Sequence, residues 1–158
     1  WGTAIKATEI LKEEFPIKTI SKKPSNYLTI KGRWQVLSDQ PKIIADIGHN
    51  EQGMAAIARQ IEKENFENLY VILGFSEDKD LKTIAKNLPK ATNYYLTKST
   101  NQRSLYPEKI KPLINGDCIC IENYKEAFNS ILSIINEKDM VIITGSAFLV
   151  GDILNDFY

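Results

Sequence analysis

The sequence predicts an α/β fold, in which a mostly parallel sheet of about six strands has helices on both faces in a Rossmann-like, three-layer arrangement. Short apolar runs alternate along the chain with segments whose apolar residues recur at helical spacing. The loops between them are short, and several runs are apolar throughout rather than at every second residue. Such continuous strands are typical of a parallel sheet covered on both faces, where helices form the connections.

The first part of the chain differs from this pattern. Residues 3–15 have helical spacing, Pro16 ends that helix, and residues 16–31 are of mixed polarity. We therefore expect residues 1–31 to be the terminal helix and linker of an upstream domain, and residues 32–158 to form the α/β domain. Because the chain starts at Trp rather than Met, we also expect it to be a trimmed or excised segment.

From residue 34 onward, strands and helices alternate. The expected strands are 34–37, 42–45, 68–73, 91–96, 117–121 and 140–144. The expected helices are 51–63, one beginning after an Asp80 cap, a short one from Pro107, one capped by Asn123 with Glu126 in a capping-box-like start, and one following Gly145-Ser146.

Composition excludes some classes of protein. The chain has 158 residues, of which 43% are hydrophobic and 25% charged, as in ordinary soluble globular proteins. Lys and Arg together number 20, as do Asp and Glu, so there is no basic excess and we do not expect nucleic acid as a partner. The sequence contains no apolar run of about 18 residues, so we expect no membrane span.

The two cysteines indicate the expected compartment. Cys118 and Cys120 are two residues apart in an expected strand, so their side chains share a face but lie too far apart for an easy disulfide. We expect reduced core thiols in a cytoplasmic protein. One histidine and two strand cysteines do not supply the ligands of a metal site, so we expect none in this chain.

A polar cluster lies where the strand 42–45 turns into the next helix. In open α/β sheets, ligands bind at this carboxyl edge, and a helix start favours phosphate. Asp46 can accept a hydrogen bond from a ribose hydroxyl, His49 can donate one to a phosphate or carboxylate oxygen, and Asn50 supports the turn. The alternative stays open that Asp46 caps the helix and His49 is an ordinary surface residue.

Other candidate residues flank this cluster. Arg33 follows Gly32, and its guanidinium fork suits phosphate oxygens, although a solvated arginine is the alternative. Ser146 lies at a second strand-to-helix corner, where it can cap the helix or approach a ligand carboxylate. Lys79 and Arg103, in two further carboxyl-end loops, would add positive charge to the same edge.

Two nucleotide-binding motifs are missing from the sequence. It has neither a Gly-x-x-x-x-Gly-Lys-[Ser/Thr] phosphate loop nor a Gly-x-Gly-x-x-Gly fingerprint. If the domain meets ATP, we expect it to contribute one wall of the site and to take the other from elsewhere.

Five short motifs nevertheless follow one another in a recognisable order: Gly32-Arg33-Trp34, Asp46-Ile47-Gly48-His49-Asn50, Gly74 to Asp80, Arg103-Ser104, and Thr144 to Gly151. From Gly32 to the C-terminus the chain resembles the C-terminal domain of folylpolyglutamate synthase/dihydrofolate synthase, a branch of the Mur ligase superfamily. That family has a Gly-Arg pair followed by an Asp-Gly-Ala-His-Asn-Pro motif. Ile47 and Glu51 depart from it here.

The resemblance implies an ATP-dependent ligase. ATP would phosphorylate a folate or pteroate carboxylate, and the amino group of glutamate would then attack the acyl phosphate. Arg33 and Asp46 would bind the nucleotide, and His49 and Ser146 would lie near glutamate, with His49 also a candidate catalytic residue. Mg²⁺ would be held by the upstream ATPase domain, so the chain alone is expected to be inactive. Its partners would be ATP, L-glutamate, folate or dihydropteroate, and that upstream domain.

Two other functions remain open at this point. One is a stand-alone α/β module that binds a small anion or a protein. The other is the C-terminal domain of a cell-wall peptide (Mur) ligase, which adds an amino acid to a UDP-linked substrate.

Overall fold

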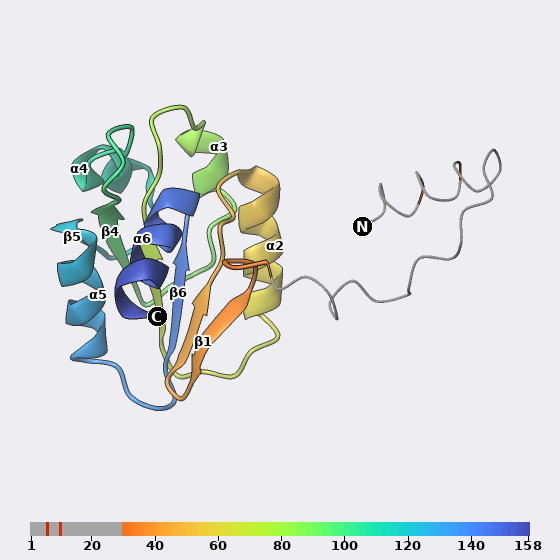
Figure 1. Cartoon of the computed structure of the whole chain (residues 1–158), viewed down its shortest axis with the longest axis vertical. Helices are drawn as coiled ribbons and strands as arrows, with labels where there is room; N and C mark the ends of the chain where they lie inside the picture. Colours follow the sequence, from red (N-terminus) through yellow and green to blue (C-terminus); the bar gives the residue numbers. More distant parts are fainter. Residues whose placement is uncertain (1–5, 7–9, 11–29) are drawn as a thin grey trace. The chain divides into compact units, whose positions relative to one another are not determined.

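One sheet of six strands organises residues 31–158, in the order β1-β2-β6-β3-β4-β5 (Figure 1). The computed structural model describes residues 6, 10 and 30–158, and the chain divides into two units, 1–30 and 31–158. Lys6 and Ile10 are helical, but the rest of the expected helix 3–15 and nearly all of the linker 16–31 lie outside the described residues.

The strands agree with the expected number and, largely, with the expected places. They are β1 (Gln35–Asp39), β2 (Lys42–Ala45), β3 (Leu69–Leu73), β4 (Asn93–Lys98), β5 (Cys118–Asn123) and β6 (Met140–Thr144). β2 pairs in parallel with β6, β6 with β3, β3 with β4 and β4 with β5. β1 runs antiparallel to β2 at the edge of the sheet. The expectation of a mostly parallel six-stranded sheet is therefore confirmed.

The helices of this unit also follow the expected pattern. They are α2 (Glu51–Ile61), α3 (Leu81–Ala85), α4 (Pro107–Ile110) with the 3₁₀ turn η2 (Lys111–Leu113), α5 (Tyr124–Leu132) and α6 (Ala147–Phe157). α3 ends before Leu88, although Leu88 continues its apolar spacing. Leu88 precedes Pro89, and the residue before a proline disfavours the helical conformation. None of the described helices is long and apolar enough to cross a membrane.

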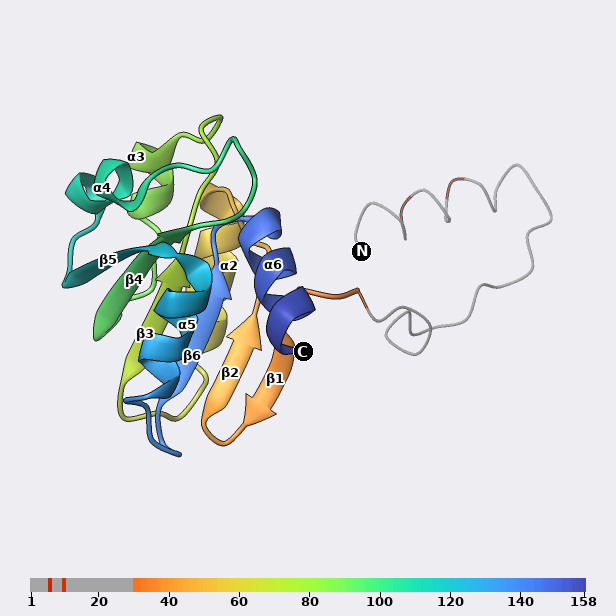
Figure 2. The same ribbon diagram turned by 60° about the vertical axis from the view of Figure 1, so that its left-hand side comes forward.

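The sheet is covered on both faces (Figure 2). On one face, residues of α2, α3 and α4, such as Met54 and Ile110, pack on β-strand residues such as Ile142. On the other face, residues of α5 and α6, such as Phe128 and Ile153, pack on residues such as Ile143. Neighbouring residues of one strand thus enter opposite cores, which explains why β3 and β6 are apolar at every position.

The two cysteines lie on one face of β5, as expected. Both are partly buried free thiols, and both pack against the core that contains α2, α3 and α4. Burial raises the pKa of the Cys118 thiol. Both therefore act as small apolar residues of that core.

The strand order creates a switch point at the carboxyl edge. β6 lies between β2 and β3, so the loops after β2 and β3 lead to helices on one face and the loop after β6 leads to α6 on the other. In open α/β sheets, a crevice for ligands forms where successive connections diverge in this way. The loops that contain the predicted residues meet at this place.

Candidate functional site

The carboxyl ends of β2, β3 and β6 are joined by hydrogen bonds. The Gly48 carbonyl accepts from the Gly145 N–H at 3.0 Å and from the Thr144 hydroxyl at 3.1 Å. The Gly74 N–H donates to the Thr144 carbonyl at 3.4 Å. The three strand ends are therefore held in contact by Thr144, the last residue of β6, and by glycines of the three loops.

Gly145 permits this close approach. Its φ is +97°, in the left-handed region, and a Cβ at this position would lie 2.4 Å from the Gly74 carbonyl oxygen. No side chain fits there without moving the backbone of one loop or the other. Glycine is thus required at position 145 both by the positive φ and by the nearby Gly74 carbonyl.

A fourth segment, the loop 99–106, brings Arg103 to the same edge. The Leu105 N–H donates to the Phe75 carbonyl at 2.8 Å, and the Glu77 N–H donates to the Arg103 carbonyl at 3.0 Å. An antiparallel bridge between Ser76 and Ser104 lies between these bonds. Residues 103–105 of the loop after β4 are therefore paired with residues 75–77 of the loop after β3.

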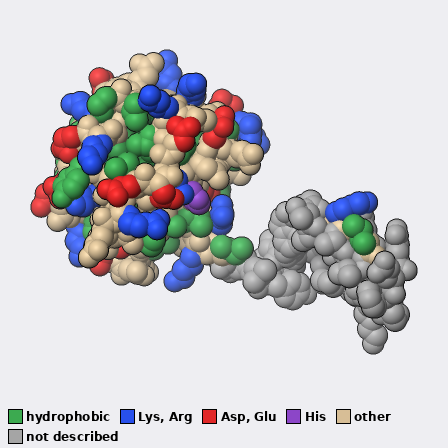
Figure 3. All heavy atoms as spheres, turned by 90° about the horizontal axis from the view of Figure 1, so that it is seen from above, with side chains coloured by type: hydrophobic (Ala, Val, Ile, Leu, Met, Phe, Trp, Pro, Cys, Tyr) green, Lys and Arg blue, Asp and Glu red, His purple; other side chains and the backbone are tan. Residues whose placement is uncertain are grey.

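These loops enclose a cavity of about 120 Å³. Its lining is His49, Ser76, Asp78, Lys79, Arg103, Gly145, Ser146, Ala147 and Phe148. Four residues singled out in the sequence thus meet at one place, although they lie in four separate loops. Figure 3 shows this face of the molecule, where the histidine reaches the surface among acidic and basic side chains.

His49 is held by its own loop. Its Nδ1 lies 2.9 Å from the Ile47 carbonyl oxygen, which can only accept, so Nδ1 carries the hydrogen. In the neutral ring, Nε2 is then an acceptor, and once protonated it becomes a donor. The ring is partly buried and lines the cavity.

The two cations of the cavity share one carboxylate. Asp78 accepts from the Lys79 ammonium at 2.9 Å and from the Arg103 guanidinium at 3.4 Å. The hydrogen bond from Lys79 and the charges of both cations lower the pKa of the Asp78 carboxyl group. Sequence reasoning missed Asp78 and Ser76. Asp78 was visible as an acid directly before Lys79, but its contact with Arg103 depends on the pairing of two distant loops.

Ser146 caps helix α6 and is almost fully buried, with 4% of its surface exposed. Its Oγ accepts from the Phe148 N–H at 3.2 Å. The hydroxyl proton remains available, so Ser146 can donate a hydrogen bond to a ligand while it caps the helix. The capping alternative and the ligand role are therefore compatible.

Asp46 anchors the turn before β1. One carboxylate oxygen accepts from the Trp34 N–H at 2.8 Å and the other from the Gly48 N–H at 2.8 Å. The Ile47 N–H donates to the Gly32 carbonyl at 2.8 Å. The alternative that Asp46 caps α2 is wrong, because Asn50 is the cap and its side chain accepts from the Gly53 N–H.

Arg33 lies in this anchored turn and is exposed. Within residues 30–158, no ion pair or side-chain hydrogen bond involves its guanidinium. Arg33 and Asp46 do not line the 120 Å³ cavity. The predicted residues therefore form two adjoining groups at the carboxyl edge of β2, joined by the loop 46–50.

The polar groups of this turn can contact an anion and a hydroxyl group. A free guanidinium can meet phosphate oxygens. Each Asp46 oxygen accepts one N–H and keeps a lone pair that can accept a further hydrogen bond. Among the described residues, no three His, Cys, Asp or Glu side chains are grouped to hold a metal ion.

Comparison with known proteins agrees with this architecture. A curated dihydrofolate synthase/folylpolyglutamate synthase of Buchnera aphidicola is 26% identical over 129 residues, which cover 80% of this chain and 31% of that protein. A UDP-N-acetylmuramoyl-L-alanyl-D-glutamate–2,6-diaminopimelate ligase of Helicobacter pylori is 22% identical over 145 residues, covering 85% of this chain and 32% of that protein. The chain thus spans about a third of the length of these relatives.

Solved structures share the fold. The crystal structure of the bifunctional folylpolyglutamate synthase/dihydrofolate synthase from Yersinia pestis superposes with a TM-score of 0.75 at 19% identity, covering 82% of this chain and 31% of that one. A further structure of a bifunctional folylpolyglutamate synthase/dihydrofolate synthase, with Mn, AMPPNP and L-glutamate bound, has a TM-score of 0.71 at 19% identity. It covers 82% of this chain and 32% of that one. The family model of the Mur ligase, glutamate ligase domain, matches residues 32–147, and the chain therefore belongs to that family.

Proposed function

We propose that this chain is the C-terminal domain of an ATP-dependent ligase that adds glutamate to a folate or dihydropteroate carboxylate through an acyl phosphate. The proposal is supported by the convergence of His49, Lys79, Arg103 and Ser146 on one small cavity, and by the exposed Arg33 in the turn that Asp46 anchors. The family assignment and the relatives named folylpolyglutamate synthase supply the reaction class.

The 120 Å³ cavity suits the incoming amino acid. Lys79 and Arg103 would meet its carboxylates, and the Ser146 hydroxyl would donate to one of them at the start of α6. Asp78 would accept from the ammonium group and keep it in place. His49, whose Nε2 is an acceptor in the neutral ring, would take a proton from this ammonium group, so that the amino nitrogen of glutamate becomes a nucleophile.

The nucleotide would lie against the neighbouring turn. Arg33 would contact its phosphates and Asp46 its ribose, while Asn50 keeps the start of α2 in shape. Magnesium would be held by an upstream ATPase domain, which would also supply the phosphate loop. Closure of the two domains would exclude water, and an acyl phosphate needs that protection because water hydrolyses it.

An assay of the full-length protein tests the proposal. We expect ADP release that requires both L-glutamate and a folate or dihydropteroate, with a glutamylated product. A cell-wall ligase would instead require a UDP-linked acceptor, and either result is unambiguous. Product formation only from the UDP-linked acceptor would contradict the folate assignment.

Calorimetry of the 158-residue chain separates the ligase domain from a stand-alone binding module. We expect the chain alone to bind ATP weakly and to form no product, because half of the site would be missing. Tight binding of ATP or of glutamate by the isolated chain would favour the stand-alone module.

A further inference from the structure

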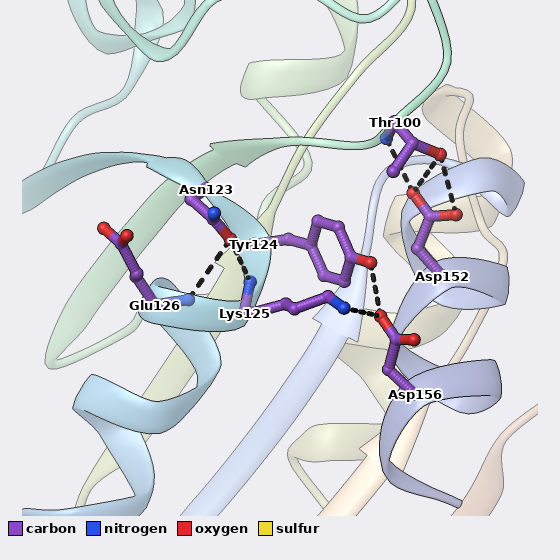
Figure 4. Close-up of polar contacts among 7 residues, drawn as sticks. All are labelled: Thr100, Asn123, Tyr124, Lys125, Glu126, Asp152 and Asp156. Carbon is purple, nitrogen blue, oxygen red and sulfur yellow. Dashed lines mark hydrogen bonds and ion pairs between the residues drawn. The ribbon is translucent and has the colours of Figure 1, made fainter.

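Helix α6 anchors the loop that carries Arg103. Figure 4 shows the contact: the Thr100 N–H donates to Asp152 at 2.7 Å, and the Thr100 hydroxyl lies 3.0 Å from each carboxylate oxygen of Asp152. Hydrogen bonds to an ionised carboxylate are stronger than those between neutral groups. Asp152 therefore holds both polar groups of one loop residue.

The loop 99–106 is already shaped by bonds within itself. The Ser99 N–H donates to the Ser104 hydroxyl at 3.0 Å, and the Arg103 N–H donates to the Asn101 side chain at 2.9 Å. At its base, the Lys98 ammonium lies 3.9 Å from the centre of the Tyr106 ring. These contacts fix the conformation of the loop. Residues 103–105 are also paired with the loop after β3, and the Thr100–Asp152 contact adds a direct connection between the first half of the loop and α6.

That position matters for the cavity, because its walls come from both elements. Arg103 belongs to the loop, whereas Ser146 and Phe148 belong to the first turn of α6 and its cap. Asp152 lies further along the same helix and does not line the cavity itself. The Thr100–Asp152 contact therefore connects the loop that forms one wall of the cavity to the helix that forms the other wall.

We infer that Asp152 is a positioning residue: through Thr100 it holds the loop 99–106 against α6 and, together with the pairing of residues 103–105 with the loop after β3, sets the width of the 120 Å³ cavity. The effect on glutamate affinity rests on the proposed function. The effect on the loop does not, because it follows from the hydrogen bonds alone.

The chain offers a matched control on the same helix. Asp156 faces α5, where it accepts from the Tyr124 hydroxyl and, at 3.0 Å, from the Lys125 ammonium (Figure 4). None of these three residues lines the 120 Å³ cavity or belongs to the loop 99–106. Replacing Asp156 removes a carboxylate of α6 without touching the Thr100 contact.

Hydrogen exchange on the 158-residue chain tests the structural part without any activity. In Asp152→Ala, we expect the amides of residues 99–104 to exchange roughly tenfold faster, since about 1.4 kcal/mol of anchoring corresponds to that factor. Asp152→Asn, which keeps one acceptor oxygen, should fall between, and Asp156→Ala should leave these amides unchanged. Should Asp152→Ala fail to fold, Thr100→Val removes the hydroxyl on the loop side of the same contact. We expect it to speed the exchange of the loop amides by a smaller factor than Asp152→Ala would. Unchanged exchange in the folded Asp152 variants, or in Thr100→Val, would overturn the inference.

Kinetics of the full-length protein test the consequence for the site. In Asp152→Ala, we expect the KM for glutamate to rise roughly tenfold while kcat and the KM for ATP change little, because positioning acts on amino-acid binding. Asp152→Asn should restore part of the loss, and Asp156→Ala should match wild type. Faster exchange with an unchanged KM for glutamate would refute the role in the site. A wild-type protein without glutamate-dependent ATP turnover would refute the proposed function and leave the exchange result standing.

Discussion

The Trp34 backbone N–H donates to the Asp46 carboxylate at 2.8 Å and so ties the turn before β1 to the end of β2. The other Asp46 oxygen accepts from the Gly48 N–H, and the Gly48 carbonyl in turn accepts from the Gly145 N–H in the loop after β6. One carboxylate therefore links the exposed Arg33 to the loops that form the cavity. The residue predicted to bind a nucleotide is also the anchor of the turn that presents the guanidinium.

Replacing Asp46 should therefore affect stability as well as activity. Asp46→Ala leaves two backbone N–H groups without their acceptor, which should cost roughly 1–3 kcal/mol of unfolding free energy. Asp46→Asn keeps one acceptor oxygen and should cost less. Urea unfolding of the chain measures both. An Asp46→Ala variant as stable as wild type would show that the carboxylate is not an anchor.

The close approach of the loops after β3 and β6 gives a second prediction. Gly145→Ala introduces a Cβ at a left-handed φ against the Gly74 carbonyl and should destabilise the chain by roughly 2–4 kcal/mol. Gly151→Ala, in the middle of α6 with nothing within 4 Å of its Cβ, should stabilise it by about 0.5–1 kcal/mol. Thermal unfolding compares the two, and equal effects would contradict the described packing.

Asp156 should make stability depend on pH in the acid range. The hydrogen bond from the Tyr124 hydroxyl and that from Lys125 lower the pKa of the Asp156 carboxyl group in the folded state. Its contribution is therefore fully present above the unfolded value of about 4 and is lost as the pH falls through the folded pKa. Asp156→Asn should lower stability at neutral pH and match wild type at strongly acid pH. A gap that persists unchanged in acid would contradict this assignment.

Tyr124 should show the opposite behaviour in alkali. Its hydrogen bond to Asp156 is the largest cause that raises the pKa of Tyr124 to about 12. Because this pKa is raised, the contribution to stability is present below about pH 10 and is lost as the pH rises towards that folded value. The absorbance titration of tyrosinate, with Tyr124→Phe to identify the group, measures it. In Asp156→Asn, the pKa of Tyr124 should move back towards 10.

Much of this fold follows from the sequence because burial on both faces leaves continuous apolar runs. β3 and β6 are such strands, and the helices α2, α3, α5 and α6 begin at residues whose side chains cap them, as Asn50 and Ser146 do. The strand order does not follow, because apolar spacing records burial and not which strands are neighbours. The insertion of β6 between β2 and β3 is what brings the loops together.

The candidate site was predictable to a similar depth. His49 and Ser146 stand out because they occupy strand ends, and both reach the cavity. Asp78, by contrast, gains its role from Arg103, which is distant in sequence and arrives through loop pairing. The Asp46 contact with Trp34 likewise depends on the antiparallel placement of β1. Both contacts depend on pairing between backbone segments that are distant in sequence, which local sequence patterns do not record.

Arg33 provides the most direct test that this edge of the domain meets the nucleotide. Its exposed guanidinium lacks a partner within residues 30–158, so Arg33→Ala should leave the unfolding free energy of the chain within about 0.5 kcal/mol of wild type. Lys31→Ala, which removes a cation from the same exposed segment, is the matched control.

The decisive measurement is the KM for ATP of the full-length protein carrying Arg33→Ala. We expect it to rise at least roughly tenfold, as the loss of a charge-assisted contact to phosphate implies, while Lys31→Ala stays near wild type. An Arg33→Ala protein that folds normally and keeps both its turnover and its KM for ATP would contradict a nucleotide contact at this turn.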